Sequence, residues 1–162
     1  MTIVSDASSL GSLALVDYLW LLEALYGTVV ISEVVAQELA TAKNARIQAV
    51  LSVNWVKVQV PTESAIAQVQ QQGKQFDLGE TQTLALALQL HADELLINER
   101  RGRQVAQALE LSAIGIVGIV IVAKQRALIP SVRRVMDALV ELAGFRISHQ
   151  LYQKVLKFVD EI

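Results

Sequence analysis

The sequence predicts an α/β protein in which a mainly parallel sheet is covered by helices on both faces. Short apolar runs rich in β-branched residues alternate with longer segments of good helix formers along the whole chain. One of these runs, Leu95-Leu96-Ile97, is short and wholly apolar, as expected for a buried strand. Hydrophobic residues make up 53% of the 162 residues, which is enough for a substantial core. We expect a single domain over residues 1–162.

Composition narrows the classes of function and the compartment. The chain has no cysteine, which excludes disulfide scaffolds and thiolate metal sites and suits the reducing cytoplasm. The net charge of -2 gives no overall attraction for nucleic acid, so any basic surface must be local. The first residues carry no cationic leader, and the most apolar run, Ala113 to Ala123, is too short to span a bilayer. We therefore expect a cytoplasmic protein with no membrane partner.

The first half of the chain contains three strand signals, each followed by helix signals. A strand is expected over Thr2 to Ser5, ending at Asp6. Two more strands are expected at residues 28–31 and 55–60. Helices are expected at 10–26 (capped by Ser8-Ser9 and stopped by Gly27), 33–41 (capped by Ser32), 44–51 and 62–72. The run WVKVQV at 55–60 alternates between apolar and mixed positions and is closed by Pro61, which is typical of an edge strand.

The second half opens with Asp77 and Glu80, three residues apart, which is the spacing of a capping box. A helix should follow over Thr81 to Leu90, then the strand at 95–97, then a basic helix start at Arg100. Periodicity does not decide the structure of residues 111–130. Their β-branched residues favour a strand, but a short strand followed by a buried helix fits as well. Two further helices are expected at 131–143 and 149–160.

Four acids stand where a binding site would form. Asp6 and Glu99 directly follow strands, and side chains just past the carboxyl ends of strands line the ligand crevice of an open α/β sheet. Glu38 and Glu80 lie on helices that can reach the same edge. Carboxylates without His or Cys favour Mg²⁺ or Mn²⁺, which activate water and clamp phosphodiesters. Each acid also has a structural interpretation, as a cap, a turn residue, a solvated side chain or a partner of the helix dipole.

The cations fall into two groups. Arg100 and Arg103 are three residues apart and would share one helical face beside Glu99, which suits contact with phosphate. The second group is expected to form a solvated face and comprises Lys124, Arg126, Arg133 and Arg134.

An ordered set of segments resembles the PIN-domain superfamily, in particular a prokaryotic branch related to VapC-type toxins. These segments are IVSDASSL, VVISEVVAQEL, FDLGETQTLALAL, ELLINERRGRQVA, IGIVGIVIVAKQRALIPSV and FRISHQLYQKVL, which together cover nearly the whole chain. The resemblance implies a three-layer α/β/α fold with a central parallel sheet. It also implies that Ile114-Gly115 closes a strand and that Val117 to Ala127 is a helix.

The PIN family is known for metal-dependent ribonucleases that use three or four acids. By position, Asp6, Glu38 and Glu80 match the first three acids. Relatives typically carry an acidic pair at the fourth position, where this chain has Asn98 and Glu99. Two further positions depart from the pattern: Ala7 stands where a hydroxyl or amide residue is usual, with Ser8 next to it, and Ile116 replaces a common threonine.

The resemblance implies a toxin-type endoribonuclease that acts on RNA, and a small antitoxin protein is expected as a possible partner. The expected catalytic residues are Asp6, Glu38, Glu80 and Glu99, the metal ligands for Mg²⁺ or Mn²⁺ are the same acids with Asn98, and the RNA contacts are Ser8, Arg100 and Arg103. The high hydrophobic fraction also leads us to expect a homodimer that buries part of Leu10 to Tyr26 or the C-terminal helices. The alternative is a catalytically degenerate PIN-like module that binds RNA or protein. An aspartyl-phosphate enzyme is disfavoured because its loop needs an Asp at position 8.

Overall fold

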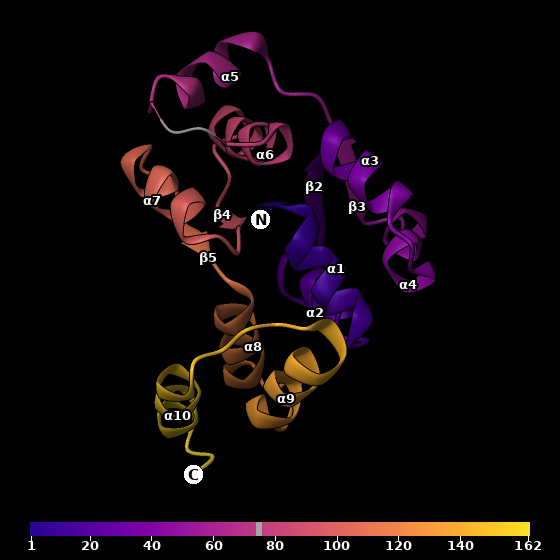
Figure 1. Cartoon of the computed structure of the whole chain (residues 1–162), viewed down its shortest axis with the longest axis vertical. Helices are drawn as coiled ribbons and strands as arrows, with labels where there is room; N and C mark the ends of the chain where they lie inside the picture. Colours follow the sequence, from indigo (N-terminus) through magenta and orange to yellow (C-terminus); the bar gives the residue numbers. More distant parts are fainter. Residues whose placement is uncertain (74–75) are drawn as a thin grey trace.

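Five parallel strands form the centre of the molecule. The computed structural model describes residues 1–73 and 76–162, and its sheet has the order β3-β2-β1-β4-β5 (Figure 1). The strands are β1 (Thr2–Ser5), β2 (Thr28–Ser32), β3 (Val56–Gln59), β4 (Glu94–Leu96) and β5 (Ala113–Ile114). Strand β1 lies in the middle, with Val4 opposite Val30 of β2 and Leu95 of β4. The expected parallel sheet is confirmed, and β3 is an edge strand as its sequence predicts.

Helices cover both faces of this sheet because neighbouring residues on each strand point to opposite sides. Ile3 and Leu96 belong to one hydrophobic cluster, and Val4 and Leu95 belong to another. The helices that contribute to the first cluster are α1 (Ala7–Leu15), α2 (Trp20–Tyr26), α3 (Glu33–Thr41), α8 (Ile116–Gln125), α9 (Val132–Ala143) and α10 (His149–Phe158). Those that contribute to the second are α5 (Glu63–Gln70), α6 (Leu78–Gln89) and α7 (Arg100–Ala108). The short helix α4 (Ala45–Gln48) and a 3₁₀ turn, η1 (Ala49–Ser52), connect α3 to β3.

The prediction of a single helix over residues 10–26 is wrong. The chain forms α1 and α2, which are bent by 118° relative to each other. Helix α1 ends in a Schellman motif, in which the Tyr18 N–H donates to the Leu13 carbonyl at 3.0 Å and Asp17 takes φ 62°. Aspartate tolerates this left-handed conformation better than most residues, so the helix ends without a glycine. Its N-cap is Asp6 rather than Ser8 or Ser9.

No single helix in the described part of the chain is long and apolar enough to cross a membrane. The bent pair formed by α1 and α2 reaches the length and composition of such a span only when the two helices are taken together.

Residues 111–130 divide into a strand and a helix, as the resemblance implies. Strand β5 covers Ala113–Ile114, and α8 begins directly after it at Ile116. Gly118 lies in α8 where a side chain would collide with Ile114, since a Cβ there would be 2.7 Å from Ile114 Cγ1. The missing side chain therefore lets α8 pack closely against the end of β5.

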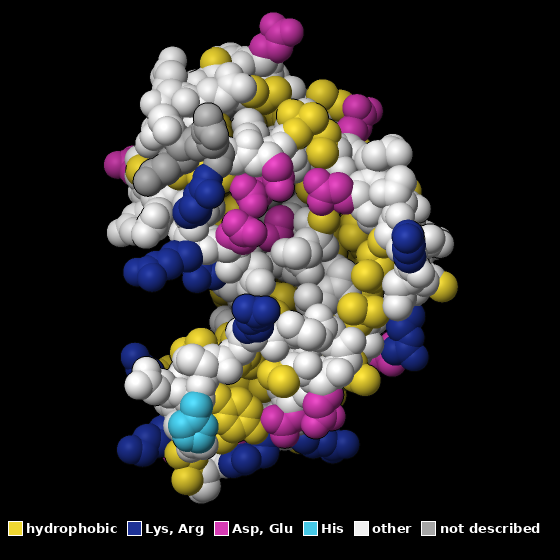
Figure 2. All heavy atoms as spheres, viewed as in Figure 1, with side chains coloured by type: hydrophobic (Ala, Val, Ile, Leu, Met, Phe, Trp, Pro, Cys, Tyr) yellow, Lys and Arg dark blue, Asp and Glu magenta, His cyan; other side chains and the backbone are white. Residues whose placement is uncertain are grey.

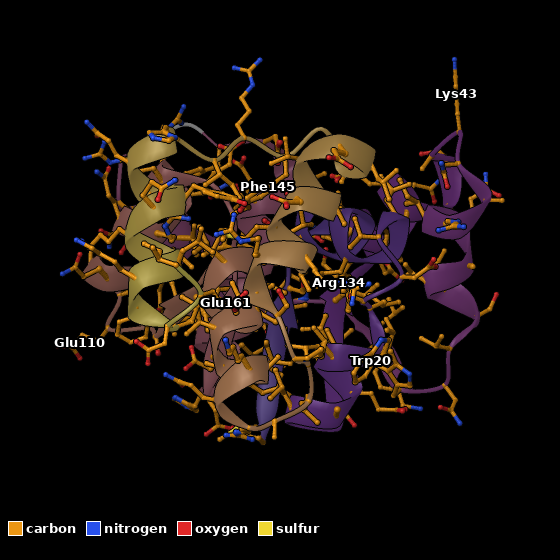
Figure 3. The ribbon with its side chains drawn as sticks, turned by 90° about the horizontal axis from the view of Figure 1, so that it is seen from below. Trp20, Lys43, Glu110, Arg134, Phe145 and Glu161 are labelled. Carbon is orange, nitrogen blue, oxygen red and sulfur yellow. The ribbon has the colours of Figure 1, made fainter. Side chains whose placement is uncertain are left out.

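The C-terminal segment is anchored by Glu161 (Figure 3). Its carboxylate accepts hydrogen bonds from the Val132 N–H at 2.6 Å, the Arg133 N–H at 3.1 Å, the Ser131 hydroxyl at 2.8 Å and Lys124 Nζ at 2.9 Å. Burial alone would raise the pKa of Glu161, but these hydrogen bonds outweigh it and lower the pKa to about 2. Lys124 and Arg133 are therefore structural partners of Glu161, which corrects the solvated face expected for these two residues. Arg126 and Arg134 are exposed, as expected.

Candidate active site

The sheet has a topological switch point between β1 and β4. Beyond β1 the sheet continues through β2 to β3, whereas beyond β4 it continues to β5, so a crevice opens at the carboxyl ends of the two middle strands. Asp6 follows β1, and Asn98 and Glu99 follow β4. The Asn98 N–H donates a hydrogen bond of 3.1 Å to Asp6 Oδ2, which joins the two strand ends directly.

Asp6 is the most buried acid at this edge, with 8% of its surface exposed. Its Oδ1 accepts a hydrogen bond of 2.9 Å from the Ser9 N–H, because Asp6 caps α1, and its Oδ2 faces Asn98 and the Ser8 hydroxyl, the latter at 3.5 Å. Burial raises the pKa of Asp6, and the hydrogen bonds from Ser9, Asn98 and Ser8 oppose that rise. The carboxylate is thus fixed in one orientation at the inner end of the crevice.

Glu38 reaches the same crevice from α3 because Gly79, in the first turn of α6, lies beside it. A Cβ on Gly79 would overlap Glu38 Oε1 and lie 3.3 Å from Glu38 Cδ. Partial burial raises the pKa of Glu38, and the charges of Asp77 and Asp6 raise it further. Glu38 therefore belongs electrostatically to the cluster around Asp6 rather than to a solvated helix face.

Glu80 and Glu99 form a pair on the other side of the crevice. Asp77 Oδ1 caps α6 by accepting the Glu80 N–H at 2.8 Å, as the capping-box spacing predicts. The Glu80 side chain is hydrogen-bonded to Glu99, and its pKa is raised to about 7 by burial first, then by the charges of Asp77 and Glu99. Arg101 acts in the opposite direction. The Glu80 carboxyl therefore keeps its proton up to near neutral pH, beside the Glu99 side chain.

All four predicted acids line one cavity of about 130 Å³, seen as the acidic cluster in Figure 2. Its lining comprises Asp6, Ala7, Ser8, Val35, Glu38, Asp77, Gly79, Glu80, Ile97 and Glu99. Asp77 is a fifth carboxylate in the lining, although the sequence indicates it only as a helix cap. The spacing could have indicated its place in the site, because a cap three residues before Glu80 must lie close to Glu80. A groove of about 370 Å³ between α1 and α3 adjoins the cavity and shares Ala7, Ser8 and Glu38 with it.

The model of a family described as a PIN domain matches residues 2–161. The chain belongs to the PIN-domain family. A comparison with curated proteins finds no match. The parallel sheet between two helical layers is thus the fold of a PIN domain, and membership of this family indicates a nuclease-type fold. The catalytic roles of the individual acids remain predictions.

The arginines beside the acids of this PIN domain differ in their surroundings. Arg103 is half-buried, and its Nη1 donates to the Asn98 carbonyl at 2.8 Å, so it stabilises the turn between β4 and α7. The Arg101 guanidinium lies 5.3 Å from the centre of the Phe76 ring. Arg100 is exposed at the start of α7. Of the two arginines predicted to contact RNA, only Arg100 is thus free of a structural role in this turn.

The donors of the cavity suit a hard cation, since all are carboxylate or hydroxyl oxygens. Burial and then the charges of neighbouring carboxylates raise the pKa values of Glu38 and Glu80, and a divalent cation would offset both effects. As the side chains stand, however, no three His, Cys, Asp or Glu side chains among residues 1–73 and 76–162 are arranged so that they could hold a metal ion. The donor chemistry therefore fits Mg²⁺ or Mn²⁺, and binding requires the carboxylates to draw together.

Proposed function

We propose that this PIN domain is a metal-dependent endoribonuclease of the toxin type, related to the VapC branch. The observation that carries the proposal is the convergence of Asp6, Glu38, Glu80 and Glu99 on one cavity at the switch point of the sheet. Four carboxylates from β1, α3, α6 and the end of β4 come from distant parts of the sequence. Such a cluster is costly without a cation, because burial and then neighbouring carboxylates oppose the ionisation of Glu38 and Glu80.

The residues have distinct roles in this proposal. Mg²⁺ or Mn²⁺ would activate water and neutralise charge on the phosphodiester. Asp6, Glu38, Glu80 and Glu99 would hold the ion, and the Asn98 side-chain carbonyl is a further oxygen donor next to them. The Asn98 main chain keeps the Asp6 carboxylate in place. Glu80, whose pKa is raised to about 7, must first lose its proton.

Substrate contacts would come from the rim of the cavity. The Ser8 hydroxyl lines the cavity next to Asp6, within reach of a phosphate oxygen or ribose hydroxyl. Arg100 is exposed at the start of α7 and would contact the RNA backbone. Arg103 would act indirectly, by holding the turn on which Asn98 and Glu99 stand.

The proposal includes protein partners. A toxin of this type is neutralised by a small antitoxin protein, and we propose one here together with a homodimer. Large hydrophobic side chains remain exposed on the helices predicted to form the dimer interface: Trp20 is 45% exposed, Leu142 63% and Phe158 66%.

A second candidate function is an RNA- or protein-binding module that has lost catalysis. Two observations favour it: no metal-holding group is formed among the described residues, and Asn98 stands where an acid is typical. Binding would then depend on Arg100 and the surrounding surface, with an affinity that falls as salt rises.

Product formation from a mixed pool of single-stranded RNA, with Mg²⁺, Mn²⁺ or EDTA, distinguishes the two functions. The nuclease predicts cleavage by the wild type in Mg²⁺ or Mn²⁺, faster cleavage or tighter metal binding by Asn98→Asp, and none by Glu80→Gln. Equal cleavage by Glu80→Gln would indicate a contaminating enzyme. If neither the wild type nor Asn98→Asp cleaves RNA with any metal, the nuclease is rejected in favour of the binding module.

A further inference from the structure

The segment between α9 and α10 carries one arginine, Arg146, whose side chain is exposed to solvent. Gly144, at φ 64°, ends α9, and the Phe145 N–H donates to the Leu139 carbonyl at 3.0 Å. Phe145 and Ile147 are half-buried and pack against the main hydrophobic cluster. Because its two neighbours face the core, Arg146 is turned to solvent, and it is exposed. The backbone that carries Arg146 is therefore fixed on both sides of it.

Arg146 has no partner within residues 1–73 and 76–162, where the structure gives it neither a hydrogen bond nor an ion pair. It is also the only Lys or Arg between Arg134 and Lys154 in the sequence. Arg133, by contrast, is held within the C-terminal part, because it donates to the Glu161 carbonyl and lies over the Tyr152 ring. An exposed guanidinium on a fixed backbone without a carboxylate partner is available to an external anion.

The segment that carries Arg146 crosses the face on which the acids are visible. Figure 1 shows the chain between α9 and α10 passing in front of the lower helices. Figure 2, in the same view, shows the acidic cluster above a hollow, with Lys and Arg side chains on both sides of the hollow. One side belongs to the region of α7, which begins with the exposed Arg100, and the other belongs to the C-terminal helices.

We propose that Arg146 binds the phosphate backbone of an RNA strand that lies across the acidic cavity, with Arg100 on the opposite side of the hollow. The inference rests on the proposed RNA substrate and adds the C-terminal part of the chain to the substrate contacts. Five carboxylates line the cavity and repel phosphates, and the net charge of -2 supplies no general attraction. Cations on both sides of the hollow offset this repulsion and hold the strand in place across the cavity.

Binding measurements test Arg146 separately from cleavage. The probe is a fluorescein-labelled single-stranded RNA of mixed sequence, titrated with Glu80→Gln protein between about 50 and 200 mM salt. Adding Arg146→Ala should weaken binding about three- to tenfold and reduce the slope of log K against log salt by about 0.7, the loss of one phosphate contact. Arg146→Lys keeps the charge and should keep most of the slope.

The matched control is Arg134→Ala, an exposed arginine on the side of α9 that Figure 3 faces, which should bind RNA like the parent. Lys43→Ala tests whether the RNA strand instead leaves the cavity along the groove between α1 and α3, because Lys43 follows Ala42 at the end of that groove (Figure 3). Affinity and slope that are unchanged in Arg146→Ala overturn the inference, whether or not Lys43→Ala weakens binding. Arg146-dependent binding by a wild type that cleaves nothing would reject the nuclease and leave this RNA path intact.

Discussion

Gly79 and Glu38 compete for the same space: a Cβ at position 79 would overlap the Glu38 carboxylate. The two residues belong to α6 and α3, which meet at the mouth of the acidic cavity. The absence of a side chain on Gly79 is therefore what allows the Glu38 carboxylate to join Asp6 and Glu80.

Gly79→Ala should separate folding from activity. Alanine stabilises a helix relative to glycine by up to about 1 kcal/mol, and the clash is with the end of a flexible side chain, so the protein should fold at least as well. The displaced Glu38 should lower cleavage or metal affinity by about 10- to 100-fold. Thermal unfolding and the RNA assay measure the two effects. Gly11→Ala in α1 is the control, because its Cβ would meet Ile47 at an ordinary 3.6 Å; equal activity of both variants would show that Glu38 is not needed.

Asp6→Asn should abolish cleavage while the chain still folds. The Asp6 carboxylate accepts two main-chain N–H groups, from Ser9 and Asn98, whereas an amide offers only one oxygen. One buried N–H then loses its acceptor, which costs about 1–3 kcal/mol. Urea unfolding at neutral pH measures the loss. Complete unfolding would make Asp6 primarily a structural residue, and retained cleavage would remove it from the catalytic group.

The Glu80–Glu99 pair should make the metal-free protein less stable as the pH rises. The folded pKa of Glu80, about 7, lies above its ordinary value of 4.5, so the folded state holds the proton more tightly. The contribution of Glu80 to stability is therefore fully present below pH 4.5 and is lost as the pH rises to about 7. Metal affinity should change in the opposite direction, because the cation displaces the proton. Thermal unfolding against pH, with and without Mn²⁺, tests both, and Glu80→Gln should flatten the dependence; a slope that persists in Glu80→Gln must come from other groups.

Glu161 should stabilise the C-terminal helices at neutral pH. Its folded pKa of about 2 lies below the ordinary 4.5, so its contribution is present above pH 4.5 and is lost as the pH falls toward 2. The difference corresponds to about 3 kcal/mol. Glu161→Gln should lower the free energy of unfolding at pH 7 by that order and leave the activity of the folded protein unchanged. Glu110→Gln, at an exposed acid, is the control. Equal stability of the two variants would mean that the hydrogen bonds to Glu161 contribute little.

Light scattering should show a homodimer, with a mass about twice the 17.7 kDa of the chain. Trp20 and Phe158 mark the two regions where its interface is expected, and both are exposed in the single chain. Glutamate at either position should then shift the equilibrium toward the monomer. A wild type that stays monomeric at high micromolar concentration would contradict the dimer.

The sheet could be predicted from the sequence because its strands are short apolar runs separated by clear caps, such as Ser32 before α3 and Asp77 before α6. The turn at Asp17 could not, since a left-handed aspartate gives no signal comparable to a glycine. The spacing of Asp77 and Glu80 predicted the helix cap, but it did not predict that Asp77 also lines the acidic cavity. The raised pKa of Glu80 depends on its burial and on the approach of α6 to the end of β4, which no sequence pattern contains.

The central position of β1 has a consequence for the order of folding. Strand β1 pairs with β2, which is close to it in the sequence, and with β4, which is separated from it by β2, β3 and the helices between them. The second pairing closes a much longer loop and has the higher entropic cost. Until it forms, β1 presents an open edge on which another chain can add a strand. The hydrogen bond from Asn98 to Asp6 forms with the same step, so partly folded chains lack the acidic cluster and gain it only when the sheet closes.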